Sequence, residues 1–245
     1  MLEVTTDGLH FSVENGVGTI RLDRADRLNS LTFDIYRRLV DLFAELQHED
    51  EERSVVVTGS GKGFCSGGDV HDIIGRLINY DAADLTKFAR MTGDVIRNMR
   101  RLRKPIVSAI NGTAAGAGAE IAMASDLRIA AEGAKIAFLF TKVGLTGADM
   151  GAAYLLPRVV GLGRATEILM FGDAVTSDEA LRYGIYNRVV PADKLQARAK
   201  AKLKTRQPLA HARVVLPKAS DREALASYLE VIVDELNVKN IEVLE

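Results

Sequence analysis

The sequence predicts an α/β fold assembled from strand–strand–helix units, and three observations support this prediction. The first part of the chain reads as two short strands, a helix and a third strand in succession. Short apolar runs then alternate with helical stretches along the rest of the chain. Two glycine-rich loops each follow a predicted strand and precede a predicted helical segment.

The bulk composition favours a globular protein without a strongly charged partner. The 245 residues are enough to bury a core, and the formal net charge is −1. We therefore expect no nucleic acid and no membrane partner. The single cysteine, Cys65, allows no internal disulfide and favours a reducing compartment. The first residues read as strands rather than as a signal peptide, and no apolar run approaches the roughly 20 residues that span a bilayer, so we predict a cytoplasmic location.

The N-terminal unit has clear local signals. Residues 9–23 predict two strands joined by a hairpin turn at Asn15-Gly16. Thr32 is of the type that caps a helix, and apolar residues recur after it at helical spacing. These residues are Ile35, Leu39, Leu42, Phe43 and Leu46. The stretch "SVVVTGSG" then predicts a short apolar strand that ends in glycines.

The remaining elements follow in order along the chain. They are a helix at 84–103, a strand in "KPIVSAI", one or two strands in "LRIAAEGAKIAF", helices at 151–160 and 163–171, and a capped helix, glycine stop and strand in "SDEALRYGIYNRVV". The C-terminal stretch reads as strand "HARVVLP", a helix at about 221–236 and strand "NIEVLE", which together make a small β-α-β segment.

Residues 111–126, "NGTAAGAGAEIAMASD", combine glycines and alanines with one glutamate, Glu120. We expect a helix to begin near Ala117, with Glu120 in its first turn. The first amides of a helix have no internal partner, so they can bind an anion or a developing oxyanion. The alternative is close helix packing with a solvated glutamate, and this stretch alone leaves both interpretations open.

A second glycine-rich loop, "GKGFCSGGD" at residues 61–69, favours the interpretation of residues 111–126 as an oxyanion site. Two such loops can each supply one amide to the same oxygen, which polarises a carbonyl and stabilises an enolate. Neither loop matches a dinucleotide or phosphate-binding motif. His71 with Asp69 and Asp72 is a poor metal-ligand set, so we predict no metal site.

Together these residues make the chain resemble the crotonase superfamily, also called the enoyl-CoA hydratase/isomerase family. The resemblance rests on "GTIRLDRADRLNSLT", "GKGFCSGGDV", "KPIVSAINGTAAGAGAEIAMASDLRIA" and "FTKVGLTGADMGAAYLLPRVVGLGRATEILMFGDAVTSDEALRYGIYNRVV". It implies a spiral of ββα units over residues 1–200 and an acyl-CoA thioester substrate. It also implies an oxyanion hole made by the amides of Gly68 and Ala117. No cofactor is implied, because coenzyme A is part of the substrate.

The resemblance also implies acid/base residues. Glu120 matches the first of two catalytic glutamates in enoyl-CoA hydratases, whereas Lys142 stands where the second is expected. Asp149 is the nearest substitute, although a turn or helix-cap role is an equal alternative. We favour hydration of a 2-enoyl-CoA. Double-bond isomerisation, thioester hydrolysis, carbon–carbon cleavage and acyl-CoA binding without catalysis stay open.

Three further expectations come from the resemblance. Arg24, Arg27, Cys65 and Ser66 are expected to contact CoA, with solvated arginines as the alternative. A homo-oligomer, either a trimer or a hexamer, is the expected assembly. Residues 203–245 depart from the family and resemble a segment near the C-terminus of isoleucyl-tRNA synthetases, so a poorly folding recombined chain is a further alternative.

Overall fold

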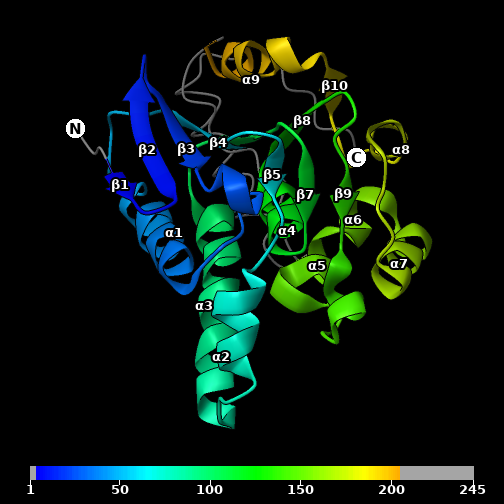
Figure 1. The fold of residues 1–245 in the computed structure, drawn as a ribbon. Helices are drawn as coiled ribbons and strands as arrows, with labels where there is room; N and C mark the ends of the chain where they lie inside the picture. Colours follow the sequence, from blue (N-terminus) through cyan, green and yellow to red (C-terminus); the bar gives the residue numbers. More distant parts are fainter. Residues whose placement is uncertain (1–3, 205–245) are drawn as a thin grey trace, which may run out of the picture. The chain divides into compact units, whose positions relative to one another are not determined.

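The computed structural model of the chain describes residues 4–204, and Figure 1 gives its path. The strands are β1 (Val4–Thr6), β2 (Leu9–Glu14), β3 (Val17–Leu22), β4 (Ser54–Gly59), β5 (Gly63–Cys65), β6 (Ile106–Ile110), β7 (Thr113–Ala115), β8 (Leu127–Ala131), β9 (Ile136–Ala137) and β10 (Arg188–Val190). The α-helices are α1 (Phe33–Glu45), α2 (Gly75–Leu77), α3 (Ala82–Arg101), α4 (Ala117–Ala124), α5 (Ala152–Leu155), α6 (Pro157–Val160), α7 (Leu162–Phe171), α8 (Ser177–Arg182) and α9 (Leu195–Lys204).

The strands form two sheets, and their order reveals a repeated unit. The larger sheet has the order β1-β2-β3-β4-β6-β8-β10, antiparallel up to β3 and parallel from β3 onward. The smaller sheet is parallel throughout, in the order β5-β7-β9. Each of β4, β6 and β8 is followed in the chain by one strand of the smaller sheet and then by helical structure. The predicted α/β fold of strand–strand–helix units is therefore confirmed.

The predicted N-terminal signals are confirmed in detail. Asn15 and Gly16 both have positive φ, 54° and 75°, as a tight hairpin turn between β2 and β3 requires. The Thr32 hydroxyl accepts a hydrogen bond from the Ile35 amide at 3.3 Å and so caps α1. These contacts fix the start of α1, which supplies one wall of the site described below.

Strand β4 is apolar throughout because both faces of the larger sheet are covered. Val55 and Val57 point into the main core, whereas Val56 points to the opposite face. On that face Leu195 and Ala199 of α9 pack against the sheet. A parallel strand buried on both sides loses the usual alternation of polar and apolar residues.

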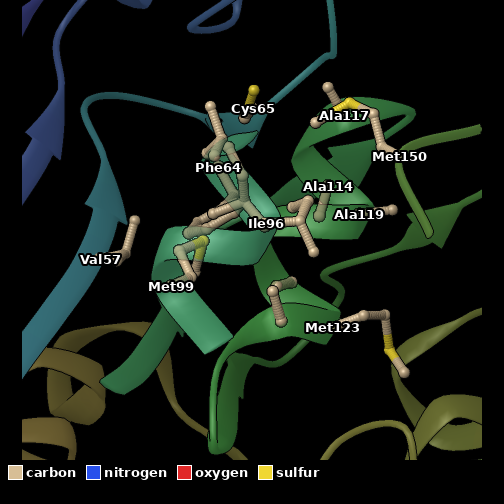
Figure 2. Close-up of a cluster of buried hydrophobic side chains, with 14 of the residues drawn as sticks. Val57, Phe64, Cys65, Ile96, Met99, Ala114, Ala117, Ala119, Met123 and Met150 are labelled. Atoms are coloured by element: carbon tan, nitrogen blue, oxygen red, sulfur yellow. The ribbon is translucent and has the colours of Figure 1, made fainter. Parts of the chain in front are cut away.

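Helices α3 and α4 form the centre of the main core. Figure 2 shows the cluster to which α3 contributes Ile96 and Met99, and α4 contributes Ala117, Ala119 and Met123. The small side chains of α4 let neighbouring elements approach it closely.

Two segments differ from the expected helices. The helix predicted at 151–160 divides into α5 and α6 at Pro157, because proline has no amide hydrogen for an internal helical bond. Residues 139–143, for which we predicted no element, form a 3₁₀ turn. The β-α-β segment predicted at 203–245 lies almost entirely outside the described residues. Across residues 4–204 no helix has both the length and the apolar character needed to cross a bilayer.

Candidate functional site

The two glycine-rich loops lie side by side because they follow neighbouring parallel strands. Strand β5 pairs with β7, so the chain leaves both strands at the same edge of the smaller sheet. A β-carbon built on Gly67 would lie 3.6 Å from the Ala117 amide nitrogen. Gly67 also has a φ of 101°, which only glycine adopts readily. Gly67 and Ala117, which belong to different loops far apart in sequence, thus lie next to each other.

The backbone around Gly68 is fixed by hydrogen bonds on both sides. The Leu31 amide donates to the Gly67 carbonyl, and the Asp69 amide donates to the Leu31 carbonyl, both at 2.8 Å. Gly68 itself forms an isolated bridge with Leu31. Within residues 4–204 the amides of Gly68 and Ala117 have no hydrogen-bond acceptor. Ala117 is the first residue of α4, where an unpaired amide is expected.

A cavity of about 370 Å³ opens beside these two amides. Gly68 and Ala117 both line it, and the remaining wall is mostly apolar. Its apolar side chains include Ile73, Leu77, Phe88, Phe140 and Met150. The volume lies in the range of small-molecule sites, and an apolar wall with a few polar groups is typical of them.

Asp149 lies on the wall of this cavity and also begins the turn that precedes α5. Its Oδ1 accepts a hydrogen bond from the Met150 amide at 2.9 Å. Burial raises the pKa of Asp149, and that hydrogen bond opposes the rise. Met150 has a φ of 49°, which is a strained conformation for a non-glycine residue. The two roles that the sequence left open for Asp149 are therefore compatible.

Glu120 lies behind the wall and not on it. It is in the first turn of α4, as predicted, but its exposed fraction is 0% and it does not line the cavity. Neither carboxyl oxygen has a hydrogen-bond partner among residues 4–204. Burial, and then the charge of Asp149, raise the pKa of Glu120 well above its ordinary value. The alternative of a solvated glutamate is wrong, and burial favours the neutral form of the carboxyl.

Lys142 stays outside the cavity. Its Nζ donates to Asp173 Oδ1 at 2.7 Å, and about half of the side chain is exposed. It is part of the 3₁₀ turn at residues 139–143, of which Leu139, Phe140 and Val143 line the cavity. The position at which the resemblance led us to expect a second glutamate therefore carries no acid/base group toward the cavity.

Arg24 is engaged inside the protein. Its Nη1 donates to the carbonyl and hydroxyl oxygens of Ser30, at 2.8 and 3.1 Å, and to Asp69 Oδ2 at 3.0 Å. Burial raises the pKa of Asp69, but hydrogen bonds from the Asp72 amide, Arg24 and Ser30 outweigh it and lower the pKa to about 2. These contacts tie the loop after β3 to the residue that follows Gly68. This geometry favours a positioning role for Arg24 over a contact with CoA.

The other predicted CoA contacts divide between surface and core. Arg27 is exposed, and within residues 4–204 its ion-pair partner is Asp26, at 3.7 Å. Ser66 lines the cavity, and its hydroxyl lies 3.4 Å from the Arg27 carbonyl oxygen. Cys65 is fully buried, and burial raises the pKa of its thiol to about 12. Its side chain therefore cannot reach a ligand, so any contact with CoA would come from its backbone.

Sequence reasoning missed Tyr36, which lines the cavity from α1. Its Oη lies 3.7 Å from the place that a β-carbon on Gly68 would occupy. The signal was its position three residues before Leu39, on the apolar face of α1. Among residues 4–204 no cluster of three or more His, Cys, Asp or Glu side chains has the arrangement of a metal site.

Comparisons with known proteins agree on one family. A family model described as enoyl-CoA hydratase/isomerase matches residues 12–230. The "Probable enoyl-CoA hydratase echA12" of Mycobacterium bovis is 37% identical over 183 residues, which are 73% of this chain and 64% of that protein. The chain thus spans slightly less than two thirds of that relative. The 1,2-epoxyphenylacetyl-CoA isomerase of Escherichia coli K12 is 37% identical over 186 residues, 75% of this chain and 70% of that protein.

Solved structures give the same result for the fold. A crystal structure of a Streptomyces coelicolor A3(2) protein, provisionally named an enoyl-CoA hydratase, has a TM-score of 0.87 and 44% identity. The match covers 93% of this chain and 86% of that one. An enoyl-CoA hydratase from Bacillus anthracis has a TM-score of 0.76 and 27% identity, over 95% and 84% of the two chains. The similarity of residues 203–245 to isoleucyl-tRNA synthetases stays a prediction.

Proposed function

Because the chain belongs to the enoyl-CoA hydratase/isomerase family, we propose that it binds an acyl-CoA thioester and moves protons on the carbons next to the carbonyl. The amides of Gly68 and Ala117 donate to the thioester oxygen and stabilise the enolate that forms when a proton leaves the adjacent carbon. Support comes from the closeness of the two loops and from the lack of an acceptor for either amide within residues 4–204.

Asp149 is the proposed acid/base group, and one observation carries this proposal. Asp149 lines the same cavity as Gly68 and Ala117, whereas Glu120 and Lys142 do not line it. A single carboxylate beside a polarised thioester suits a 1,3-proton shift. Asp149 removes a proton from C2 of a 3-enoyl-CoA, which leaves a dienolate. It then returns the proton to C4, and the product is the 2-enoyl-CoA.

Hydration of a 2-enoyl-CoA is the second candidate, and the pair formed by Glu120 and Asp149 favours it. The charge of Asp149 raises the pKa of Glu120, so the two carboxyl groups are close enough to interact. In this reaction Asp149 takes a proton from water that adds at C3, and Glu120 supplies the proton that C2 gains. Glu120 would have to reach the cavity by a movement of α4 or of Asp149.

One absorbance measurement separates the two reactions. The conjugated 2-enoyl thioester has an enone absorption band that the 3-enoyl and 3-hydroxyacyl thioesters lack. With 3-hexenoyl-CoA the signal rises if the protein is an isomerase. With crotonyl-CoA it falls if the protein is a hydratase. The first result is the expected one. No change with either substrate, while CoA esters bind, would contradict both reactions.

Two variants test the assignment of the base. Asp149→Asn should lower kcat by about 10²- to 10⁴-fold with either substrate. Asp173→Asn is the matched control, because Asp173 pairs with Lys142 outside the cavity and should leave kcat unchanged. Equal activity of the Asp149→Asn variant and the parent protein would contradict Asp149 as the base.

The remaining parts of the proposal rest on the family alone. Coenzyme A enters as part of the substrate, with Arg27 and Ser66 as its proposed contacts. The homo-oligomer and the cytoplasmic location stay predictions. Thioester hydrolysis and carbon–carbon cleavage gain no separate support from the geometry.

A further inference from the structure

Among the described residues 4–204, one polar side chain that lines the cavity has no hydrogen-bond partner and no role in the proposed chemistry. The cavity wall holds four polar side chains, namely Tyr36, Ser66, Thr92 and Asp149. Three of them have hydrogen bonds, to Arg27, Ala89 and Met150 respectively. The Tyr36 hydroxyl has none within residues 4–204.

Tyr36 is held rigidly at this position. Its residue exposure is 3%, and its ring packs edge-on against Phe88, with the ring centroids 6.0 Å apart. Ile73 completes this part of the wall beside Gly68. Burial, together with Cys65 and Asp149, raises the pKa of Tyr36 far above its ordinary value, so the hydroxyl keeps its proton and acts as a donor.

The location of the hydroxyl fixes which part of a substrate it can meet. The Oη atom lies 3.7 Å from the place of a β-carbon on Gly68, whose amide is a proposed donor to the thioester oxygen. A group that accepts a hydrogen bond from Tyr36 must therefore sit on one of the first carbons of the acyl chain. A plain hydrocarbon chain would cover the hydroxyl without pairing it, which is unfavourable.

We propose that Tyr36 recognises an oxygen atom on C2 or C3 of the acyl group, so that the site takes oxygen-bearing acyl-CoA esters in preference to plain ones. This inference rests on the proposed function, since the thioester oxygen between Gly68 and Ala117 gives the acyl chain its direction. A buried donor aimed into an apolar site discriminates strongly against ligands that lack the matching acceptor.

The test compares binding of butyryl-CoA, 2-hydroxybutyryl-CoA and 3-hydroxybutyryl-CoA by calorimetry. The three ligands differ by one hydroxyl and share the CoA part. We expect the parent protein to bind one hydroxylated ester at least about fivefold more tightly than butyryl-CoA. In Tyr36→Phe, which removes only the hydroxyl, this preference should disappear while butyryl-CoA binding is kept or improved.

Tyr154→Phe is the matched control, because Tyr154 is exposed and does not line the cavity. It should keep the preference of the parent protein. Equal binding of all three esters by the parent protein, or an unchanged preference in Tyr36→Phe, would contradict the inference about Tyr36 and leave the proposed function standing. If no protein binds any of the esters, the proposed function fails as well. Thermal melting of each variant verifies that the fold is kept.

Discussion

Gly118 lies directly against the backbone of Cys65. A β-carbon at position 118 would sit 2.2 Å from the Cys65 carbonyl oxygen, well inside the distance at which atoms repel. This contact joins the start of α4 to the end of β5, and it therefore joins the two glycine-rich loops. The absence of a side chain at this residue is a condition for bringing the amides of Gly68 and Ala117 together.

Gly118→Ala should separate the two loops. The new methyl group meets a main-chain atom, which cannot turn away as a flexible side chain can. We expect kcat/KM to fall by about 10²-fold or more, since small displacements of positioning groups have effects of this size. Gly163→Ala is the control, because Gly163 is also the second residue of its helix and has no atom within 4 Å of the added carbon. That variant should keep full activity and gain about 0.5 kcal/mol of stability.

The pH dependence of kcat should report Asp149 as the base. The base must be ionised, so activity should rise as the pH increases through the pKa of Asp149, which lies above the ordinary aspartate value of about 4. Burial and then the charge of Asp149 raise the pKa of Glu120 well above its ordinary value, so we expect Asp149 to ionise first as the pH rises. Glu120→Gln should therefore leave the acidic limb of the profile where it is. A shift of that limb in Glu120→Gln would show that the two groups titrate as a coupled pair.

Asp69 should stabilise the fold at neutral pH and lose this effect in acid. Its pKa is lowered to about 2 in the folded protein, against about 4 in an unfolded chain. The lowered pKa stabilises the folded protein by about 2 kcal/mol at pH values above the pKa of Asp69 in the unfolded chain. This contribution disappears as the pH falls from about 4 to 2. Urea unfolding of Asp69→Asn should show a deficit at pH 7 that shrinks toward pH 3. Asp26→Asn, at an exposed aspartate, should show no such trend.

Arg128 should be essential for the C-terminal end of α4. Its buried guanidinium donates to the carbonyl oxygen of Ser125, the C-cap of α4, and to that of Ile185 in the segment after α8, each at 2.6 Å. Arg128→Met leaves these carbonyls unpaired and should lower the free energy of unfolding by about 3 kcal/mol. Arg158→Met, at an exposed arginine, should change it by less than about 0.5 kcal/mol. Comparable values for the two variants would contradict this account.

Local signals in the sequence were sufficient to predict many of the turns, caps and helix starts of the fold. The turn at Asn15-Gly16 and the cap at Thr32 depend on neighbouring residues only, so both could be predicted. The start of α4 near Ala117 followed from a change in composition at one point of the chain. The division at Pro157 was missed, because helical spacing continues on both sides of the proline.

The candidate site was less predictable, because it depends on residues far apart in sequence. The resemblance matches Glu120 to a catalytic glutamate, but packing around α4 places its side chain behind the cavity wall. Tyr36 was missed, since its place on the apolar face of α1 indicates burial but not that its hydroxyl lies near Gly68. The inward engagement of Arg24 depends on Asp69, which lies in another loop.

That the proposed carbonyl donors at Gly68 and Ala117 are main-chain amides has a consequence for how this chain tolerates mutation. A main-chain donor survives every amino-acid replacement except proline. The side chains at 120, 142 and 149 have no such protection and can be exchanged one at a time. Under the proposed function, lineages that diverge from this scaffold can therefore change the acid/base side chains while they inherit the proposed carbonyl-binding backbone unaltered.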